Sequence, residues 1–103
     1  MDRITKLNEF LTANPGDSFV KHALALEFIK LGDDVRARSL FEEILSLEPG
    51  YIGSYYHLAK LLERNSKTDD AIKVYEKGME EAKRAGDNHA YSELKAAHEE
   101  LIF

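Results

Sequence analysis

The chain of 103 residues contains no cysteine. Disulfide bonds, thiolate zinc sites, iron–sulfur clusters and cysteine nucleophiles are therefore excluded, and packing has to hold the fold together. Long apolar runs are also missing, because charged residues interrupt every apolar stretch before it reaches the roughly 18 residues that a membrane span needs. The first residues, Met-Asp-Arg-Ile-Thr-Lys, lack the apolar core of a signal peptide. We therefore expect a cytoplasmic protein with no membrane partner.

Positive charge is in short supply. The sequence has 14 basic and 19 acidic residues, which gives a formal net charge of −5. A protein of this charge does not attract phosphate backbones, so we expect no nucleic-acid partner. Hydrophobic residues make up 44% of the chain, which is typical of a folded domain and not of a disordered tail. The length suits one domain and excludes a second domain with its own core.

A repeat of 34 residues runs through the sequence. Pro15 and Pro49 are each followed by a glycine and lie 49 − 15 = 34 positions apart. A fixed period of this length indicates a repeat architecture, in which each repeat is one supersecondary unit. The same shift superposes four further pairs: Leu24 on Leu58, Ala25 on Ala59, Ala37 on Ala71 and Phe41 on Tyr75.

Each repeat predicts two helices joined by a tight turn. Gly32 followed by Asp33 predicts a glycine stop and then a helix N-cap, and Pro49-Gly50 predicts the end of the second helix. In the next repeat Thr68 is the predicted N-cap. Apolar residues three and four apart form a stripe on each helix: Leu24, Phe28 and Leu31; Ala37, Leu40, Phe41, Ile44 and Leu47; Tyr55, Leu58 and Leu62.

The two ends of the chain extend the pattern. Residues 1–14 align with the second helix of a repeat, since the 34-residue shift places apolar residues on apolar residues. We expect this segment to be required for folding. We also expect its four apolar side chains to be buried: Ile4, Leu7, Phe10 and Leu11. After Gly86 and Asp87 a last apolar stripe predicts a capping helix, formed by Ala90, Tyr91, Leu94, Ala97, Leu101 and Ile102. The predicted organisation is a single domain, 1–103, made of a half repeat (1–14), two repeats (17–50 and 51–84) and a capping helix (87–103).

The order of these residues resembles the tetratricopeptide repeat (TPR) motif, in which Leu-Ala-x2-aromatic is followed by Ala-x3-aromatic and proline. It stands here as Leu24-Ala25-x2-Phe28, Ala37-x3-Phe41 and Pro49, and again as Leu58-Ala59-x2-Leu62 and Ala71-x3-Tyr75. The chain is similar to small bacterial TPR proteins of about this length. The resemblance implies an all-α fold, a right-handed superhelix of antiparallel helix hairpins with about two and a half repeats plus a capping helix.

Two positions depart from the family pattern. Lys21 stands where the family often has tryptophan, and Lys83 replaces the proline that would end the repeat. The second departure predicts a longer helix at the end of that repeat, because nothing there forces the helix to stop.

The resemblance also implies a function. TPR domains are non-enzymatic protein–protein interaction modules, which bind a peptide or partner segment in a concave groove lined by the first helices. No catalytic residue, metal or cofactor is implied. The groove positions of the family fall on Phe19, His22, Leu26, Ile29, Gly53, Tyr56, Lys60 and Glu63. At about 100° per residue, helical geometry independently places the first four on the side opposite Val20, Leu24 and Phe28.

Other interpretations of these residues stay open. The apolar stripe with Phe19, Leu26 and Ile29 can pack on neighbouring helices, or it can form a homodimer, which would make the protein a self-assembling structural module. His22 and His57 invite a metal hypothesis with Glu63, but a metal needs three or four ligands, so we expect ordinary histidines and no enzyme.

Three further predictions concern polar and aromatic residues. Tyr55 and Tyr75 are expected in the core, which leaves Tyr56 for a ligand. The run from Glu76 to Arg84 is expected to be a solvated helix face. His89 and His98 are expected to be surface or edge histidines on different faces.

Overall fold

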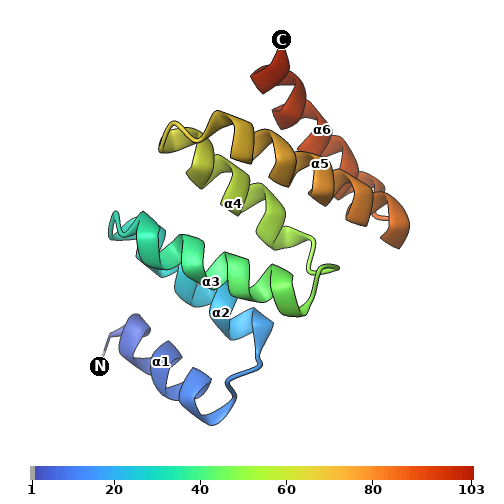
Figure 1. Ribbon diagram of the computed structural model, residues 1–103. Helices are drawn as coiled ribbons and strands as arrows, with labels where there is room; N and C mark the ends of the chain where they lie inside the picture. Colours follow the sequence, from blue (N-terminus) through green and yellow to red (C-terminus); the bar gives the residue numbers. More distant parts are fainter. Residues whose placement is uncertain (1) are drawn as a thin grey trace. The chain divides into compact units, whose positions relative to one another are not determined.

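The computed structural model describes residues 2–103, and it is all-α, as predicted (Figure 1). Six helices follow one another in this part of the chain: α1 (Arg3–Ala13), α2 (Ser18–Lys30), α3 (Asp34–Leu47), α4 (Gly53–Arg64), α5 (Thr68–Ala85) and α6 (Asn88–Ile102). Short turns join α1 to α2, α2 to α3, α4 to α5 and α5 to α6, and the two helices of each of these pairs pack against one another.

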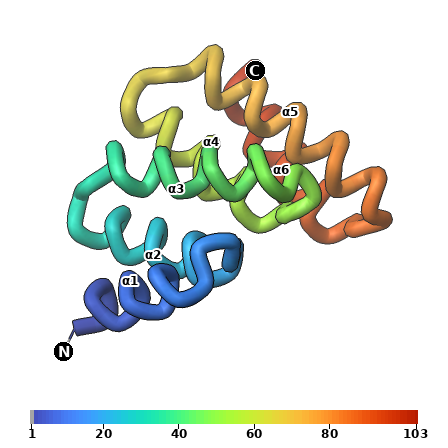
Figure 2. The backbone as a smooth tube through the Cα atoms, turned by 60° about the horizontal axis from the view of Figure 1, so that its bottom comes forward, coloured from blue at the N-terminus to red at the C-terminus, as the bar shows by residue number. Residues whose placement is uncertain are grey.

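The helices form two compact units, which we describe separately. The first unit, Met1–Glu48, holds α1 to α3, and the second, Pro49–Phe103, holds α4 to α6. In the first unit α2 packs against both α1 and α3, and in the second α5 packs against both α4 and α6. Figure 2 shows the first of these arrangements, with α2 between α1 and α3. Each unit therefore has a central helix that contacts both of its neighbours.

The turns follow the predicted chemistry in two places. Gly32 has a φ of 77°, and the carboxylate of Asp33 accepts a hydrogen bond of 3.1 Å from the backbone N–H of Arg36, which caps α3. Gly86 has a φ of 71°, and Asp87 caps α6 in the same way. Positive φ is open to glycine without steric cost, so each glycine ends one helix and the aspartate starts the next.

The predicted N-cap of α5 is wrong. Thr68 is the first residue of the helix, and the N-cap is Lys67, which makes no side-chain cap hydrogen bond. The residue with positive φ in this turn is Ser66, at 62°. Ser66 and Lys67 lie 34 positions after Gly32 and Asp33. The turn therefore lies at the same position in both repeats, although different residue types form it.

The core of the first unit is where the repeat pattern places it. Five fully buried side chains form it: Leu24, Ala25, Ala37, Phe41 and Ile44. The small alanines leave room for the two helices to approach closely. Leu31 and Leu47, predicted in the same stripes, are instead 69% and 65% exposed. Leu31 is the C-cap of α2 and Leu47 the last residue of α3, so each lies where its helix ends and the facing helix no longer covers it.

The core of the second unit contains both predicted tyrosines. Tyr55 and Tyr75 are buried together with Leu61, Leu62 and Leu94, and the hydroxyl of Tyr55 donates a hydrogen bond of 2.5 Å to the carbonyl oxygen of Pro49. The helix α5 has 18 residues, against 14 in α3, which confirms the prediction from Lys83.

Gly78 lies at a place where the helices of the second unit pack tightly. A Cβ atom built on this glycine of α5 would lie 2.7 Å from Cβ of Tyr55 on α4 and 3.1 Å from Cδ1 of Leu94 on α6. Real Cβ atoms essentially never come as close as 2.7 Å to another heavy atom, and a contact of 3.1 Å is tighter than nine in ten of theirs. The absence of a side chain at Gly78 therefore lets α5 pack against α4 and α6 at this level.

The expected burial of α1 is wrong. None of its residues is buried; Ile4, Leu7 and Leu11 are half-buried, and Phe10 is 56% exposed. In the first unit α1 packs against α2 alone. A helix inside a repeat array is covered by neighbours on more than one side, so α1, with one neighbour, stays partly exposed.

The expectation of a solvated face on α5 is wrong at three residues of the run from Glu76 to Arg84, because Gly78, Glu81 and Ala82 are buried. Glu81 is buried, and its carboxylate forms ion pairs with Nζ of Lys77 at 3.2 Å and with a guanidinium nitrogen of Arg84 at 3.0 Å. The predicted pair of Glu80 and Arg84 is present at 3.4 Å. Two cations one turn away neutralise Glu81, which makes its burial tolerable.

Candidate partner-binding faces

The helix α2 carries the predicted apolar stripe. Phe19, at the start of the helix, is 73% exposed, and His22, Leu26 and Ile29 are half-buried. These positions are three, four and three residues apart, so they follow one line along the helix. An aromatic ring open to water at the end of such a line is a typical feature of a contact surface.

The start of α2 is firmly held. The carboxylate of Asp17 accepts a hydrogen bond from the backbone N–H of Val20 at 3.1 Å, and the Ser18 hydroxyl donates one of 2.8 Å to the carboxylate of Glu48, which follows α3. The ring of His22 meets the buried ring of Phe41 edge-on, with centroids 5.6 Å apart. Phe19 is therefore exposed on a backbone that caps and cross-links fix in place.

The helix α4, in the second unit, carries a different face. Tyr56, Lys60 and Glu63 are all half-buried and lie along one side, while Gly53 is the exposed first residue of the helix. Nζ of Lys60 lies 5.6 Å from the ring centroid of Tyr56 and 3.6 Å from the carboxylate of Glu63. The cation is thus placed between a π face and an anion of its own helix.

Glu63 is also tied to the core of this unit. The hydroxyl of the buried Tyr75 on α5 donates a short hydrogen bond to its carboxylate. Burial raises the pKa of Tyr75 well above its ordinary value, and the bond to Glu63 raises it further, so the phenol stays neutral and keeps donating. The sequence predicted a core position for Tyr75 but carried no signal for the partner of its hydroxyl.

The structure places the predicted residues in two sets. Phe19, His22, Leu26 and Ile29 come together on α2, and Tyr56, Lys60 and Glu63 come together on α4. The α2 set is mainly apolar, whereas the α4 set combines one aromatic ring with a cation and an anion. Their chemistry therefore differs, and each set is a candidate face by itself.

The histidines occupy structural surroundings. Burial lowers the pKa of His57, and the nearby charge of Glu93 opposes the shift; its ring meets that of Tyr56 edge-on at 5.9 Å. His98 has a largely covered side chain whose Nε2 lies 3.2 Å from the carboxylate of Glu76, whereas His89 is almost fully exposed. Of the two, only His89 is a surface histidine; His98 joins α6 to α5.

Two searches of residues 2–103 bear on other kinds of site. No group of three or more histidine, aspartate or glutamate side chains there is arranged to hold a metal ion. No helix in the same range is long and apolar enough to cross a membrane.

Comparison with solved structures finds two close relatives from Salinibacter ruber. A tetratricopeptide repeat domain protein solved by NMR is 44% identical and superposes with a TM-score of 0.82, over 85% of this chain and 89% of that one. A crystal structure of a tetratricopeptide repeat domain protein from the same organism is 45% identical with a TM-score of 0.79, over 82% of this chain and 94% of that one.

A third structure shares the fold at much lower identity. A protein from Bordetella parapertussis is 19% identical with a TM-score of 0.83, over 98% of this chain and 88% of that one. No curated protein matches the chain. The family model described as tetratricopeptide repeat matches residues 28–97. Together with the hairpin packing and the buried alanines, this match shows that the chain belongs to the tetratricopeptide repeat family.

Proposed function

We propose that the protein is a non-enzymatic interaction module whose α2 face holds an apolar segment of a partner protein. The observation that carries the proposal is Phe19, which is 73% exposed on a backbone fixed by Asp17 and by the bond between Ser18 and Glu48. An exposed aromatic ring on a fixed backbone has only its side-chain rotamers to lose when it binds, and aromatic residues supply much of the binding energy in protein interfaces. TPR domains are in general protein-interaction modules, which supports the same function.

The rest of the α2 line suits an extended or helical peptide. Leu26 and Ile29 are half-buried, so they offer apolar area beside Phe19 without being part of the core. The face spans little more than three helical turns, and a contact of that size falls at the low end for specific complexes. We therefore expect dissociation constants of about micromolar.

The α4 face, in the second unit, is more polar and is considered separately. Tyr56 offers an aromatic surface, but Lys60 is already engaged by Glu63 at 3.6 Å. A carboxylate of a partner would have to compete with Glu63 for this cation, which weakens any preference for acidic peptides. We assign the recognition of the apolar segment to α2 and treat Tyr56 as a separate contact point on α4.

Photo-crosslinking tests the proposal. The residue at Phe19 is replaced by the photoreactive analogue p-benzoylphenylalanine, and the purified protein is irradiated in a lysate of the cells that make it. The matched control places the same analogue at Phe10, which is also an exposed aromatic position but lies on α1. We expect one protein to be captured from Phe19 and not from Phe10.

A second substitution distinguishes specific binding from non-specific adsorption. Leu26→Glu puts a charge on the α2 line and should abolish the crosslink, provided that its circular dichroism melt is unchanged. If Leu26→Glu unfolds the chain, His22→Ala takes its place. Equal capture from both analogue positions contradicts the proposal, and a crosslink to a second copy of the chain supports the self-assembling alternative instead.

A further inference from the structure

A second surface of the first unit lies along α3, apart from the α2 line. Two hollows meet there. The first, of about 480 Å³, is lined only by α3 residues: Ser39, Glu42, Glu43, Ser46 and Leu47. The second, of about 230 Å³, takes in residues of all three helices: Asn8, Leu11, Leu24, Phe28, Arg36, Ser39, Leu40 and Glu43. They share Ser39 and Glu43 and so form one furrow along α3, which we call the α3 furrow.

The α3 furrow has an apolar floor and is long enough for a helix. Leu24 and Phe28 of α2 are buried beneath it, and Leu11 of α1 and Leu40 of α3 are half-buried at its sides. Leu47 stands at its far end, 65% exposed. From Arg36 to Leu47 the helix rises about 16 Å, which matches three turns of a second helix laid alongside.

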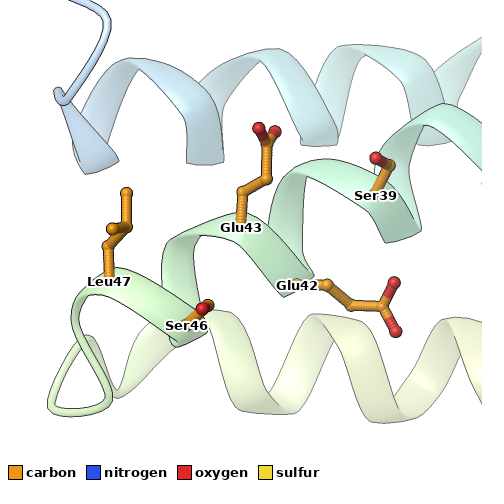
Figure 3. Close-up of a pocket in the computed structure, with 5 residues that line it drawn as sticks. All are labelled: Ser39, Glu42, Glu43, Ser46 and Leu47. Carbon is orange, nitrogen blue, oxygen red and sulfur yellow. The ribbon is translucent and has the colours of Figure 1, made fainter.

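The charge of the α3 furrow is uneven. Arg36, at one end, forms an ion pair with Asp33 at 3.5 Å, and its guanidinium group lies 5.6 Å from the ring centroid of Phe28. Its positive charge is therefore compensated within the first unit. Glu42 is paired with Arg38 at 3.2 Å. Glu43, which lines both hollows, forms no ion pair among residues 2–103. Figure 3 shows its side chain pointing to the same side of α3 as that of Leu47.

The end of α3 adds to this negative potential. The helices α2, α4 and α5 each carry a basic residue in their last turn, whereas α1, α3 and α6 have none there. The negative end of the helix dipole is therefore not compensated by a local cation, and Glu43 and Glu48 lie near it. An apolar surface that ends in uncompensated negative charge favours a ligand that is apolar along one side and positive at one end.

We propose that the α3 furrow binds an amphipathic helical segment of a partner, with leucine-like anchors on the floor and a lysine or arginine opposite Glu43. This site lies on α3 and is separate from the α2 line with Phe19, so it stands or falls independently of the function proposed above. A module with both faces connects two proteins instead of holding one.

Two synthetic peptides of about 14 residues test the furrow. Both are alanine-based helices with leucines spaced three and four apart; one carries two lysines beside the leucine stripe, and the other carries glutamates at the same places. Titration of the isotopically labelled full chain, followed by NMR, should shift the signals of Leu11, Leu40, Glu43 and Leu47 with the lysine peptide only. The signals of Phe19 and Ile29 should stay in place.

Two substitutions define the contribution of charge and of apolar contact. Glu43→Gln should weaken the lysine peptide by about two- to fivefold, as expected for a partly exposed ion pair, and Leu47→Ser should weaken it by about fivefold. Both residues are exposed, so neither variant should unfold. Glu9→Gln, on the exposed side of α1 and outside both hollows, is the control and should bind unchanged.

Three results would overturn the proposal. Equal shifts with both peptides would show that charge plays no part. Shifts confined to the α2 line would move the peptide to the other face. The absence of shifts at millimolar peptide would show that the furrow is a solvated helix surface.

Discussion

Gly78 is the position where one methyl group should reveal how tightly the second unit is packed. In Gly78→Ala the new Cβ would lie 2.7 Å from Cβ and 2.9 Å from Cγ of Tyr55, and 3.1 Å from Cδ1 of Leu94. The first two atoms belong to the base of a buried side chain, which cannot swing away. The hydroxyl of Tyr55 is bonded to the carbonyl of Pro49, so a shift of the ring also strains that bond. The helices α4 and α5 must therefore move apart.

Two opposing effects set the size of the change. Inserting a methyl group into a packed core costs about 1–3 kcal/mol. Replacing glycine by alanine within a helix returns about 0.5–1 kcal/mol, because the unfolded chain loses conformational freedom. The overpacking is the larger effect, and we expect Gly78→Ala to lower the free energy of unfolding by about 1–2 kcal/mol. For a domain of this size that corresponds to a fall in Tm of about 4–16 °C.

Urea denaturation followed by circular dichroism measures the change. The midpoint should move to lower urea while the slope stays the same, because the surface exposed on unfolding is unaltered. Gly50→Ala is the matched control: a Cβ there meets nothing within 4 Å, so its effect should stay within about 0.5 kcal/mol. A Gly78→Ala variant as stable as the parent would refute the inference that this glycine sets the distance between the helices.

Two further predictions follow from burial. Burial raises the pKa of Tyr55 from 10.0 to about 12. As the pH rises, the unfolded chain therefore loses this proton before the folded protein does. The contribution of the protonated Tyr55 to the free energy of unfolding is complete below pH 10 and is lost as the pH rises towards 12. Urea midpoints measured across this range should fall, and Tyr55→Phe should reduce the slope of that fall; an unchanged slope would count against the assignment. Deletion of residues 1–14 should lower the thermal midpoint but leave a cooperative transition, because the half-buried Ile4, Leu7 and Leu11 contribute roughly 2–5 kcal/mol as an upper estimate. Loss of the transition in calorimetry would show that α1 is indispensable.

The comparison of sequence and structure shows what a period can predict. The 34-residue shift located the hairpins and the buried Ala25, Ala37, Ala59 and Ala71, because burial in a repeat protein depends on register. The N-cap of α5 also depends on register. Thr68 was preferred for its residue type, but the turn follows the register of Ser66 and Lys67, since tertiary packing overrides a local propensity.

The candidate faces were harder to predict. Helical spacing placed Phe19 and Leu26 on one line, and the structure adds that Phe19 is exposed on a fixed backbone. The exposure of Leu47 could not be predicted from its stripe, because the end of a helix is covered only if the neighbouring helix reaches that far. The α3 furrow therefore had no signal in the sequence, as it depends on where α1 and α2 stop covering α3.

The buried carboxylate of Glu81 has its two cations, Lys77 and Arg84, on its own helix. A buried charge whose partner lies on another segment is left uncompensated when the two segments separate. In α5 the two cations that neutralise Glu81 stay beside it whenever the helix moves as a unit. This helix can therefore shift against its neighbours, or open during partial unfolding, without leaving a lone charge in an apolar place.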